Sequence, residues 1–259
     1  MGKVYIVGAG PGDPDLITVK GMKAIESADV ILYDRLVNKT LLEYAKPNTR
    51  FIYCGKDPNG PSIPQSEINH LLVSLASKGH TVTRLKGGDP FLFGRGAEEA
   101  EILADHHLPF EIVPGITSGI AAPAYAGIPV THRDYSSSVA FVTGVNKSQT
   151  FKQDYWKHLA RGPETLCIYM GVSRLPEISR LLIENGRAAD TPAALVYQGT
   201  SDVQQTAIGT LETIVEDAKD FKNPSMIVVG EVVRMNSKIN WFQEYAQHQQ
   251  ETEAAAAQS

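Results

Sequence analysis

Strand-like and helix-like segments alternate through the first 113 residues, and this alternation limits the chain to a small set of folds. Short runs rich in Val, Ile and Tyr are separated by longer stretches with helical spacing. Strands that alternate with helices are typical of parallel sheets with crossover helices. We therefore predict a mostly parallel sheet with strands at 3–7, 30–33, 50–54, 81–85 and 110–113, and helices at 16–27, 66–78 and 97–106.

Pro114 and Gly115 interrupt this alternation, and a second series of elements follows. Two successive strand-like segments close in sequence, 193–197 and 204–208, predict a hairpin and hence a mixed sheet. We expect an N-terminal α/β domain at 1–114, a C-terminal α/β domain at 115–245 and a flexible tail at 246–259. The expected second-domain strands are 139–143, 165–170, 193–197, 204–208 and 226–229, with helices at 116–126, 174–185 and 211–218.

Composition excludes several classes of function. A formal net charge of −5 without a basic stripe argues against nucleic acid as a partner. No run of 18 apolar residues exists, so no membrane span is expected, and Lys3 with the Gly/Pro/Asp-rich stretch from Gly8 breaks any signal region. Cys54 and Cys167 lie in apolar runs and read as buried free thiols, and the seven histidines form no metal-ligand spacing with them. We expect a cytoplasmic protein without a metal site.

The segment Gly87-Gly88-Asp89 follows a predicted strand and precedes a predicted helix. Glycines at a strand end let the backbone approach a ligand closely, and strand ends are where α/β folds bind ligands. Asp89 repels phosphate but accepts hydrogen bonds from hydroxyl or ammonium groups. A plain turn, with Gly for positive φ, explains the segment equally well when it is taken alone.

The loop Gly8-Ala9-Gly10-Pro11-Gly12-Asp13 resembles a dinucleotide-binding fingerprint only in part. The third glycine of that fingerprint should stand at 13, where this chain has Asp13. Pro11 removes an N–H that a pyrophosphate would use, and an acid at a helix start disfavours phosphate. Nicotinamide or flavin binding is therefore the weaker interpretation, although Asp34 could imitate the ribose-binding acid of such folds.

Charged residues follow three of the predicted strands: Asp34 and Arg35, then Lys56 beside Gly55, then Arg84 and Lys86. Each alone is more often a solvated surface charge. Because the carboxyl ends of parallel strands share one edge of a sheet, we expect these groups to converge there.

Together these blocks resemble the tetrapyrrole-pathway class of S-adenosylmethionine-dependent methyltransferases, and within it the members that act on uroporphyrinogen III. The resemblance covers residues 3 to about 243. The matching segments are 7–13, Tyr33-Asp34-Arg35-Leu36-Val37, Gly55-Lys56, 84–96, Pro114-Gly115-Ile116-Thr117-Ser118 and Ile128-Pro129-Val130-Thr131-His132-Arg133.

The resemblance implies two α/β domains with a ligand cleft between them, usually in a homodimer. It implies S-adenosyl-L-methionine as methyl donor, S-adenosyl-L-homocysteine as its product, and a small-molecule tetrapyrrole substrate, converted to precorrin-2 by methylation of two pyrrole carbons. Asp34 would accept a proton and Lys56 would donate one, with Arg35 and Arg84 on the substrate side. The implied cofactor contacts are Pro11, Gly87, Gly88, Asp89, Leu92, Thr117, Ser118, Met170 and Gly199.

The residues agree with this implication. A positive sulfonium suits the acids at Asp13 and Asp89, and an octacarboxylate substrate suits local cations on an acidic chain. Two alternatives remain open: another member of the class acting on a later corrin precursor, and a non-catalytic sensor of cofactor or tetrapyrrole.

Overall fold

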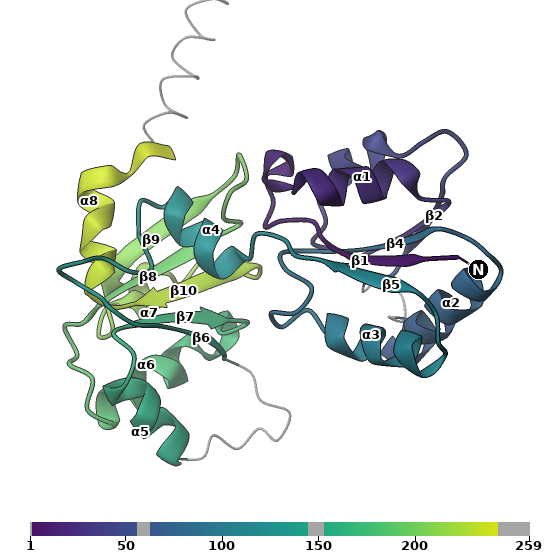
Figure 1. Ribbon diagram of the computed structural model, residues 1–259. Coiled ribbons are helices and arrows are strands. Elements are labelled where there is room, and N and C mark those ends of the chain that lie inside the picture. Colours follow the sequence, from purple (N-terminus) through teal and green to yellow (C-terminus); the bar gives the residue numbers. More distant parts are fainter. Residues whose placement is uncertain (1, 56–62, 145–152, 243–259) are drawn as a thin grey trace, which may run out of the picture. The chain divides into compact units, whose positions relative to one another are not determined.

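The computed structural model describes residues 2–55, 63–144 and 153–242. The chain divides into two compact units, Met1–Thr117 and Ser118–Ser259, called here the N-terminal and C-terminal units. Each contains a five-stranded sheet with helices on both of its faces (Figure 1). The prediction of two α/β folds is confirmed. The boundary after residue 114 stays a prediction, and the tail predicted at 246–259 lies outside the described residues.

The N-terminal sheet, predicted to be mostly parallel, is parallel throughout. Its strand order is β3-β2-β4-β1-β5. The central strands are buried along nearly their whole length, because helices cover both faces of the sheet. This explains why β1 and β2 read as apolar runs in the sequence, whereas β4 buries Thr83, Arg84 and Lys86 as well. Their bounds are β1 (Val4–Gly8), β2 (Val30–Tyr33), β3 (Arg50–Tyr53), β4 (Val82–Lys86) and β5 (Phe110–Val113).

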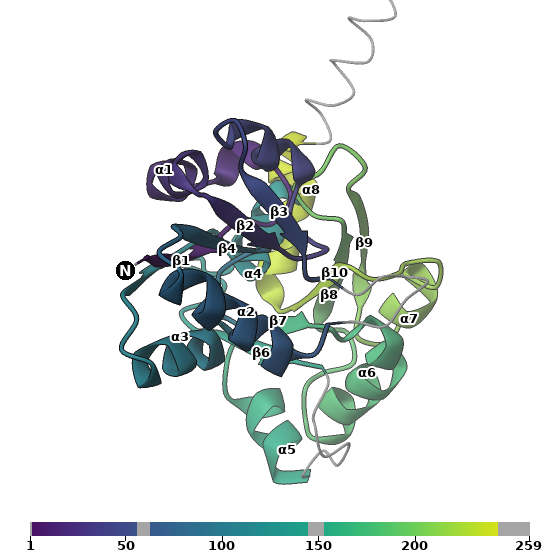
Figure 2. The ribbon, with the colours of Figure 1, turned by 90° about the vertical axis from the view of Figure 1, so that its right-hand side faces the viewer.

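Helices α1 (Val19–Ser27), α2 (Gln65–Ser77) and α3 (Gly96–Asp105) connect these strands. Helix α1 lies on one face of the sheet, and α2 and α3 lie on the other (Figures 1 and 2). The helix predicted at 16–27 is divided, because Thr18 caps α1 by accepting the N–H of Gly21 at 3.0 Å. A 3-10 helix at Pro14–Leu16 precedes that cap, and a second one spans Lys39–Tyr44.

The C-terminal sheet is mixed, with the order β6-β7-β10-β8-β9. Strand β6 is parallel to β7, while β10 is antiparallel to both β7 and β8. Strands β8 and β9 form the predicted hairpin, with Tyr197 opposite Gln205. The strands are β6 (Val139–Thr143), β7 (Thr165–Tyr169), β8 (Pro192–Tyr197), β9 (Gln205–Thr210) and β10 (Ser225–Val229).

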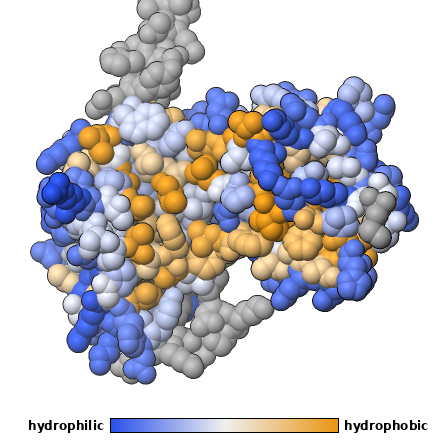
Figure 3. All heavy atoms as spheres, viewed as in Figure 1, coloured by the Kyte–Doolittle hydropathy of each residue, from blue (hydrophilic) through white to orange (hydrophobic). Residues whose placement is uncertain are grey.

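Helix α4 (Ser118–Tyr125) packs on one face of this sheet, and helices α5 (Gln153–Arg161), α6 (Leu175–Glu184) and α7 (Ile214–Asp217) pack on the other. The remaining elements are α8 (Asn236–Ile239) and 3-10 helices at Val172–Arg174 and Glu231–Met235. On the face seen in Figure 3, hydrophobic surface of this unit gathers over its sheet and α4, whereas α5 is mainly hydrophilic.

Candidate active site

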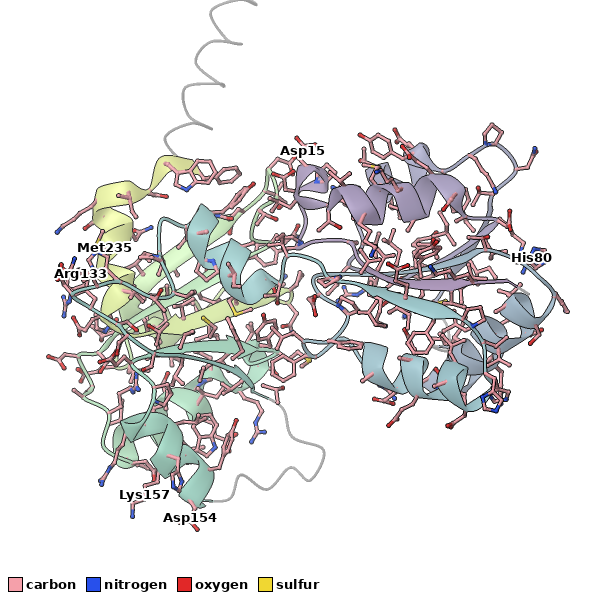
Figure 4. The ribbon with its side chains drawn as sticks, viewed as in Figure 1. Asp15, His80, Arg133, Asp154, Lys157 and Met235 are labelled. Carbon is pink, nitrogen blue, oxygen red and sulfur yellow. The ribbon has the colours of Figure 1, made fainter. Side chains whose placement is uncertain are left out.

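Three loops of the N-terminal unit meet at one edge of its sheet. They follow β4, β1 and β5, which are neighbours in the sheet. Two backbone hydrogen bonds join the first two loops: Gly88 N–H donates to the Gly10 carbonyl at 2.6 Å, and Gly10 N–H donates to the Gly88 carbonyl at 3.2 Å. Figure 4 marks this end of the unit by Asp15 and the opposite end by His80. The loops after these three neighbouring strands therefore lie together at the carboxyl edge of the sheet.

Glycine is required in these loops because backbones touch. A Cβ on Gly8 would lie 2.6 Å from the Gly88 carbonyl oxygen and 2.6 Å from the Gly115 Cα. A Cβ on Gly115 would lie 2.4 Å from the same oxygen. Gly88 also has a φ of 68°, in the left-handed region that favours glycine. The glycines thus serve loop-to-loop packing, a reason that is additional to any approach of a ligand.

The Asp89 carboxylate fixes two of these loops. One oxygen accepts the N–H groups of Phe91 at 2.8 Å and Leu92 at 3.1 Å, and the other accepts the N–H of Gly115 at 3.0 Å. Each carboxylate oxygen keeps lone-pair capacity beyond these bonds. The side chain is therefore held in place as an acceptor on the loop surface, which suits a hydroxyl or a positively charged group.

Asp34 follows β2 and belongs to a buried charge cluster with Arg84 and Lys86 of β4 and Glu99 of α3. Arg84 Nη2 donates to Asp34 Oδ1 at 2.6 Å, and Arg84 Nε donates to Glu99 Oε1 at 3.0 Å. Lys86 Nζ donates to the same Glu99 oxygen at 2.9 Å and lies 3.8 Å from Asp34 Oδ2. Asp34 is 29% exposed at its side chain, whereas the other three are at most 3% exposed. The cluster thus presents one carboxylate to its surroundings.

Neighbouring charges stabilise the ionised forms of Glu99 and Arg84 in this cluster, but not that of Lys86. Burial raises the pKa of Glu99, but the cations of Arg84 and Lys86 outweigh it and leave that pKa lowered. Burial likewise opposes the charge of Arg84, and the carboxylates of Glu99 and Asp34 leave its pKa raised. For Lys86, burial and the nearby Arg84 prevail, so its pKa is lowered. Lys86 is therefore the most readily neutralised cation of the cluster.

This burial changes one expectation from the sequence. Arg84 and Lys86 do not stand exposed at the sheet edge, because Glu99 lies beneath them and neutralises them inside the unit. Arg35 is exposed as expected. Lys56, the proposed proton donor, lies outside the described residues. The assignment of Arg84 to substrate binding stays a prediction, and the structure adds that its guanidinium holds Asp34.

Glu99 is the residue that the sequence reasoning missed. It shares the buried face of α3 with Gly96, Ala100 and Leu103. A charged residue at an otherwise apolar helical position is rare unless it is paired. That pattern, visible in the sequence, would have identified it.

In the C-terminal unit the predicted residues lie at the carboxyl ends of β7 and β8. Met170 follows β7 with a φ of 55° and is 46% exposed. Gly199 lies between β8 and β9, where an added Cβ would sit 2.4 Å from the Ala122 Cβ of α4. Ser118 begins α4, and the next residue, Gly119, donates its N–H to the Tyr169 hydroxyl at 2.8 Å. The start of α4 is thus held against the end of β7.

Left-handed backbone conformations concentrate in the same C-terminal loops. Gln198 and Thr200 have φ values of 43° and 73°, on either side of Gly199. Non-glycine residues in this region cost energy and cluster at ligand sites. The loop after β8 is therefore a structurally specified turn.

The donor set fits an adenosyl sulfonium better than a phosphate compound. The loop after β1 carries Asp13 and Asp15 and no basic side chain up to Thr18. Large apolar side chains are exposed on the loops after β4 and β5, namely Phe91, Phe93 and Ile116. These side chains are therefore accessible to a ligand at the loops. Glycine-lined backbone, a fixed carboxylate and apolar side chains together suit a cationic ligand with a flat aromatic part.

Other chemistries find no support in the part of the chain that the structure describes. Among residues 2–55, 63–144 and 153–242, no group of three or more His, Cys, Asp or Glu side chains could hold a metal ion. None of the helices within those ranges is long and apolar enough to cross a membrane. Cys54 and Cys167 are buried free thiols, as predicted.

The chain is similar to known proteins of one family. Residues 3–215 match the family model of the Tetrapyrrole (Corrin/Porphyrin) Methylases. The chain is 57% identical over 256 residues to the uroporphyrinogen-III C-methyltransferase of Bacillus subtilis, covering 98% of this chain and 100% of that one. It is 61% identical over 238 residues to the enzyme of that name from Priestia megaterium, covering 91% and 100%.

A solved structure is also similar. It is uroporphyrin-III C-methyl transferase from Thermus thermophilus in complex with S-adenyl homocysteine, with a TM-score of 0.77 and 38% identity. The match covers 90% of this chain and 99% of that one.

Proposed function

We infer the reaction from one premise: this chain belongs to the tetrapyrrole (corrin/porphyrin) methylase family. It is a methyltransferase that uses S-adenosyl-L-methionine to methylate uroporphyrinogen III at two pyrrole carbons, giving precorrin-2. The mechanism rests on the exposure of Asp34. Its carboxylate is the one partly exposed member of an otherwise buried charge cluster at the carboxyl edge of the N-terminal sheet.

S-adenosyl-L-methionine supplies a methyl group on a positively charged sulfur. We assign its contacts to the residues that the sequence indicated. In the N-terminal unit they are backbone-rich positions and one fixed acid: Pro11, Gly87, Gly88, Asp89, Leu92 and Thr117. In the C-terminal unit they are Ser118, Met170 and Gly199. Backbone hydrogen bonds set the conformations of the loops that would hold this cofactor. Such fixed loops would lower the entropic cost of aligning the methyl donor with the substrate.

We propose that Asp34 accepts the proton that must leave the macrocycle after each new C–C bond forms. A reduced pyrrole ring is an enamine-like nucleophile, so its attack needs orientation more than activation. Positioned acid–base groups contribute about 10²–10⁴-fold to such steps. Lys56 is proposed as the matching proton donor. Arg35, exposed next to Asp34, is proposed to bind a substrate carboxylate.

Arg84 acts differently in this proposal. Because its guanidinium is 2% exposed and bonded to Asp34 and Glu99, it orients the Asp34 carboxylate from behind. Its contribution to substrate binding passes through Asp34.

The test is methyl transfer from labelled S-adenosyl-L-methionine to uroporphyrinogen III, with mass spectrometry of the product. The wild type is expected to add two methyl groups. Asp34→Asn keeps an acceptor for Arg84 but cannot take a proton, so turnover should fall about 10²-fold or more. Binding of S-adenosyl-L-homocysteine, measured by calorimetry, should be unchanged. Asp105→Asn, a surface change on α3, is the matched control. Unchanged turnover in Asp34→Asn would remove Asp34 from this role.

We also propose that the enzyme works as a cytoplasmic homodimer. Sedimentation velocity should then show a species of twice the chain mass. A species of single chain mass at assay concentrations would contradict the proposal.

A further inference from the structure

Two members of the buried charge cluster have no role in the mechanism given so far. Glu99 is fully buried on α3, and Lys86 is 3% exposed at the end of β4. Neither can reach a ligand directly. Glu99 nevertheless contacts Arg84, which holds Asp34, and Lys86 lies 3.8 Å from Asp34 itself.

We propose that Glu99 is a positioning residue that acts through Arg84 and Lys86, and that its negative charge sets how readily Asp34 accepts a proton. This inference rests on the proposed function, in which Asp34 is the proton acceptor. By the same inference, the positive charge of Lys86 has the opposite effect and makes the Asp34 carboxylate harder to protonate.

Glu99 is hydrogen-bonded to both cations. Its Oε1 accepts Arg84 Nε at 3.0 Å, Lys86 Nζ at 2.9 Å and Gln65 Nε2 at 3.0 Å. Both cations also face Asp34, Arg84 through a 2.6 Å hydrogen bond and Lys86 at 3.8 Å. Each cation therefore bridges the buried carboxylate to the partly exposed one.

The Oε2 atom of Glu99 makes Glu99→Gln a suitable test of the charge alone. Among the described residues, the buried Oε2 of Glu99 has no hydrogen-bond partner. Glu99→Gln can place its amide nitrogen there and keep the oxygen that accepts the three donors. The exchange then removes the charge while leaving an acceptor for Arg84 and Lys86.

The sign of the effect follows from the charges. With all four groups ionised, two cations balance two carboxylates. Glu99→Gln leaves an excess positive charge beside Asp34, which makes that carboxylate harder to protonate and a weaker base. Lys86→Met leaves an excess negative charge, which makes it easier to protonate. A charge within a few ångströms shifts such a protonation by about 1–3 pH units.

The other groups near Asp34 do not reverse this sign. Cys54, at the end of β3, interacts electrostatically with Asp34, and burial raises the pKa of its thiol to about 11, so it is uncharged near neutral pH. Gln65, which packs against Glu99 from α2, carries no charge. Arg35, the neighbour of Asp34, is exposed, so water screens its charge. Among the residues that the structure describes, Arg84, Lys86 and Glu99 set the balance.

The experiment is the pH profile of kcat/KM for methyl transfer to uroporphyrinogen III. The variants are Glu99→Gln, Lys86→Met and the double variant, with Glu101→Gln on the exposed side of α3 as control. In Glu99→Gln the acidic limb should shift about one pH unit toward lower pH, and kcat should fall about tenfold. In Lys86→Met the limb should shift about one pH unit toward higher pH. The double variant restores charge balance, so its limb should return toward that of the wild type. The carboxylates of the substrate titrate alike for every variant.

A merely structural role for Glu99 would lower activity without moving the two limbs in opposite directions. Shifts in the same direction, or no shift, would overturn the inference while leaving the proposed function intact. If the wild type forms no methylated product, the proposed function fails and this inference fails with it. Should Glu99→Gln not fold, as judged by circular dichroism, Lys86→Met and the double variant give the same comparison of signs.

Discussion

Asp89 and Gly115 are joined by a hydrogen bond of 3.0 Å that ties the loop after β4 to the loop after β5. The same carboxylate accepts two more backbone N–H groups, from Phe91 and Leu92. One side chain therefore organises two of the three loops at the proposed cofactor site, and glycine packing holds the third.

Asp89→Ala should destabilise the protein, because three backbone donors lose a charged acceptor. Hydrogen bonds to charged groups contribute about 1.5–3 kcal/mol each when buried, and this half-buried site should lose roughly 2 kcal/mol in total. Urea unfolding measures the change. Binding of S-adenosyl-L-homocysteine should weaken as well, and Asp105→Ala serves as the surface control. Equal stability of Asp89→Ala and wild type would mean that water replaces the carboxylate at no cost.

Gly115→Ala should be more damaging than its single added methyl suggests. The new Cβ would meet the Gly88 carbonyl oxygen at 2.4 Å and the Gly8 Cα at 2.7 Å, and backbone cannot rotate away as a side chain can. We expect a loss of about 3 kcal/mol, the upper part of the usual range for overpacking. The comparison variant is Gly79→Ala, which has open space around its Cβ and only a positive φ of 91° to oppose it. Its cost should be about 1 kcal/mol, and equal costs for the two variants would contradict the steric argument.

The strands could be predicted because both faces of the N-terminal sheet are covered, so β1 and β2 are apolar along their length. The hairpin of β8 and β9 was visible from two strand-like runs separated by a short turn. The burial of Arg84 could not be predicted, because a cation at a strand end looks exposed in a sequence. Only the Glu99 carboxylate, which α3 brings against Arg84, explains this burial. Pairing between residues on different elements depends on tertiary packing, which local patterns do not encode.

Helix α5 and the 3-10 helix at Lys39–Tyr44 were also missed. In α5 the buried Trp156, Leu159 and Ala160 have helical spacing, so the signal was present, but it spans only nine residues of largely polar sequence. Short helices of this kind are stabilised by packing more than by propensity. The loops proposed to bind the cofactor were predicted from their glycine content, although the contact between backbones that requires those glycines became visible only in the structure.

Gly199→Ala should destabilise the C-terminal unit, and Ala122→Gly should partly rescue it. The added Cβ would lie 2.4 Å from the Ala122 Cβ, and removing that methyl leaves the Ala122 Cα at 2.9 Å as the nearest atom. We expect Gly199→Ala to cost about 2 kcal/mol and Ala122→Gly about 1 kcal/mol. The double variant should be more stable than the sum of the two losses predicts. Simple additivity in a double-mutant cycle would show that the two residues are not in contact.

The two cysteines should be unreactive in the folded protein. Burial raises the pKa of Cys54 to about 11 and that of Cys167 to about 12, so the thiolate is scarce near neutral pH. At pH 8, Ellman's reagent should label neither thiol of the native protein and both in guanidinium chloride. Cys54→Ser should leave one reactive thiol after unfolding. Rapid labelling of the native protein would mean that one of the strand ends opens easily.

Glu111 should make the protein more stable at neutral than at acidic pH. On β5 it accepts a hydrogen bond from Lys3 at 2.6 Å and pairs with Lys20 of α1. The hydrogen bonds from Lys20 and Lys3 lower the pKa of Glu111 from its ordinary 4.5 to about 2. Because the folded state binds the proton less readily than the unfolded state, the ionised carboxylate stabilises the fold above about pH 4.5, and this stabilisation is lost as the pH falls toward 2.

Glu111→Gln should therefore lower the urea midpoint at pH 7 and make progressively less difference below pH 4.5, while Glu101→Gln should change it little at either pH. Because the pair is solvent-screened, added salt should also reduce the difference at pH 7. A difference between wild type and Glu111→Gln that stays constant from pH 7 to pH 3 would exclude the ion pairs as its cause.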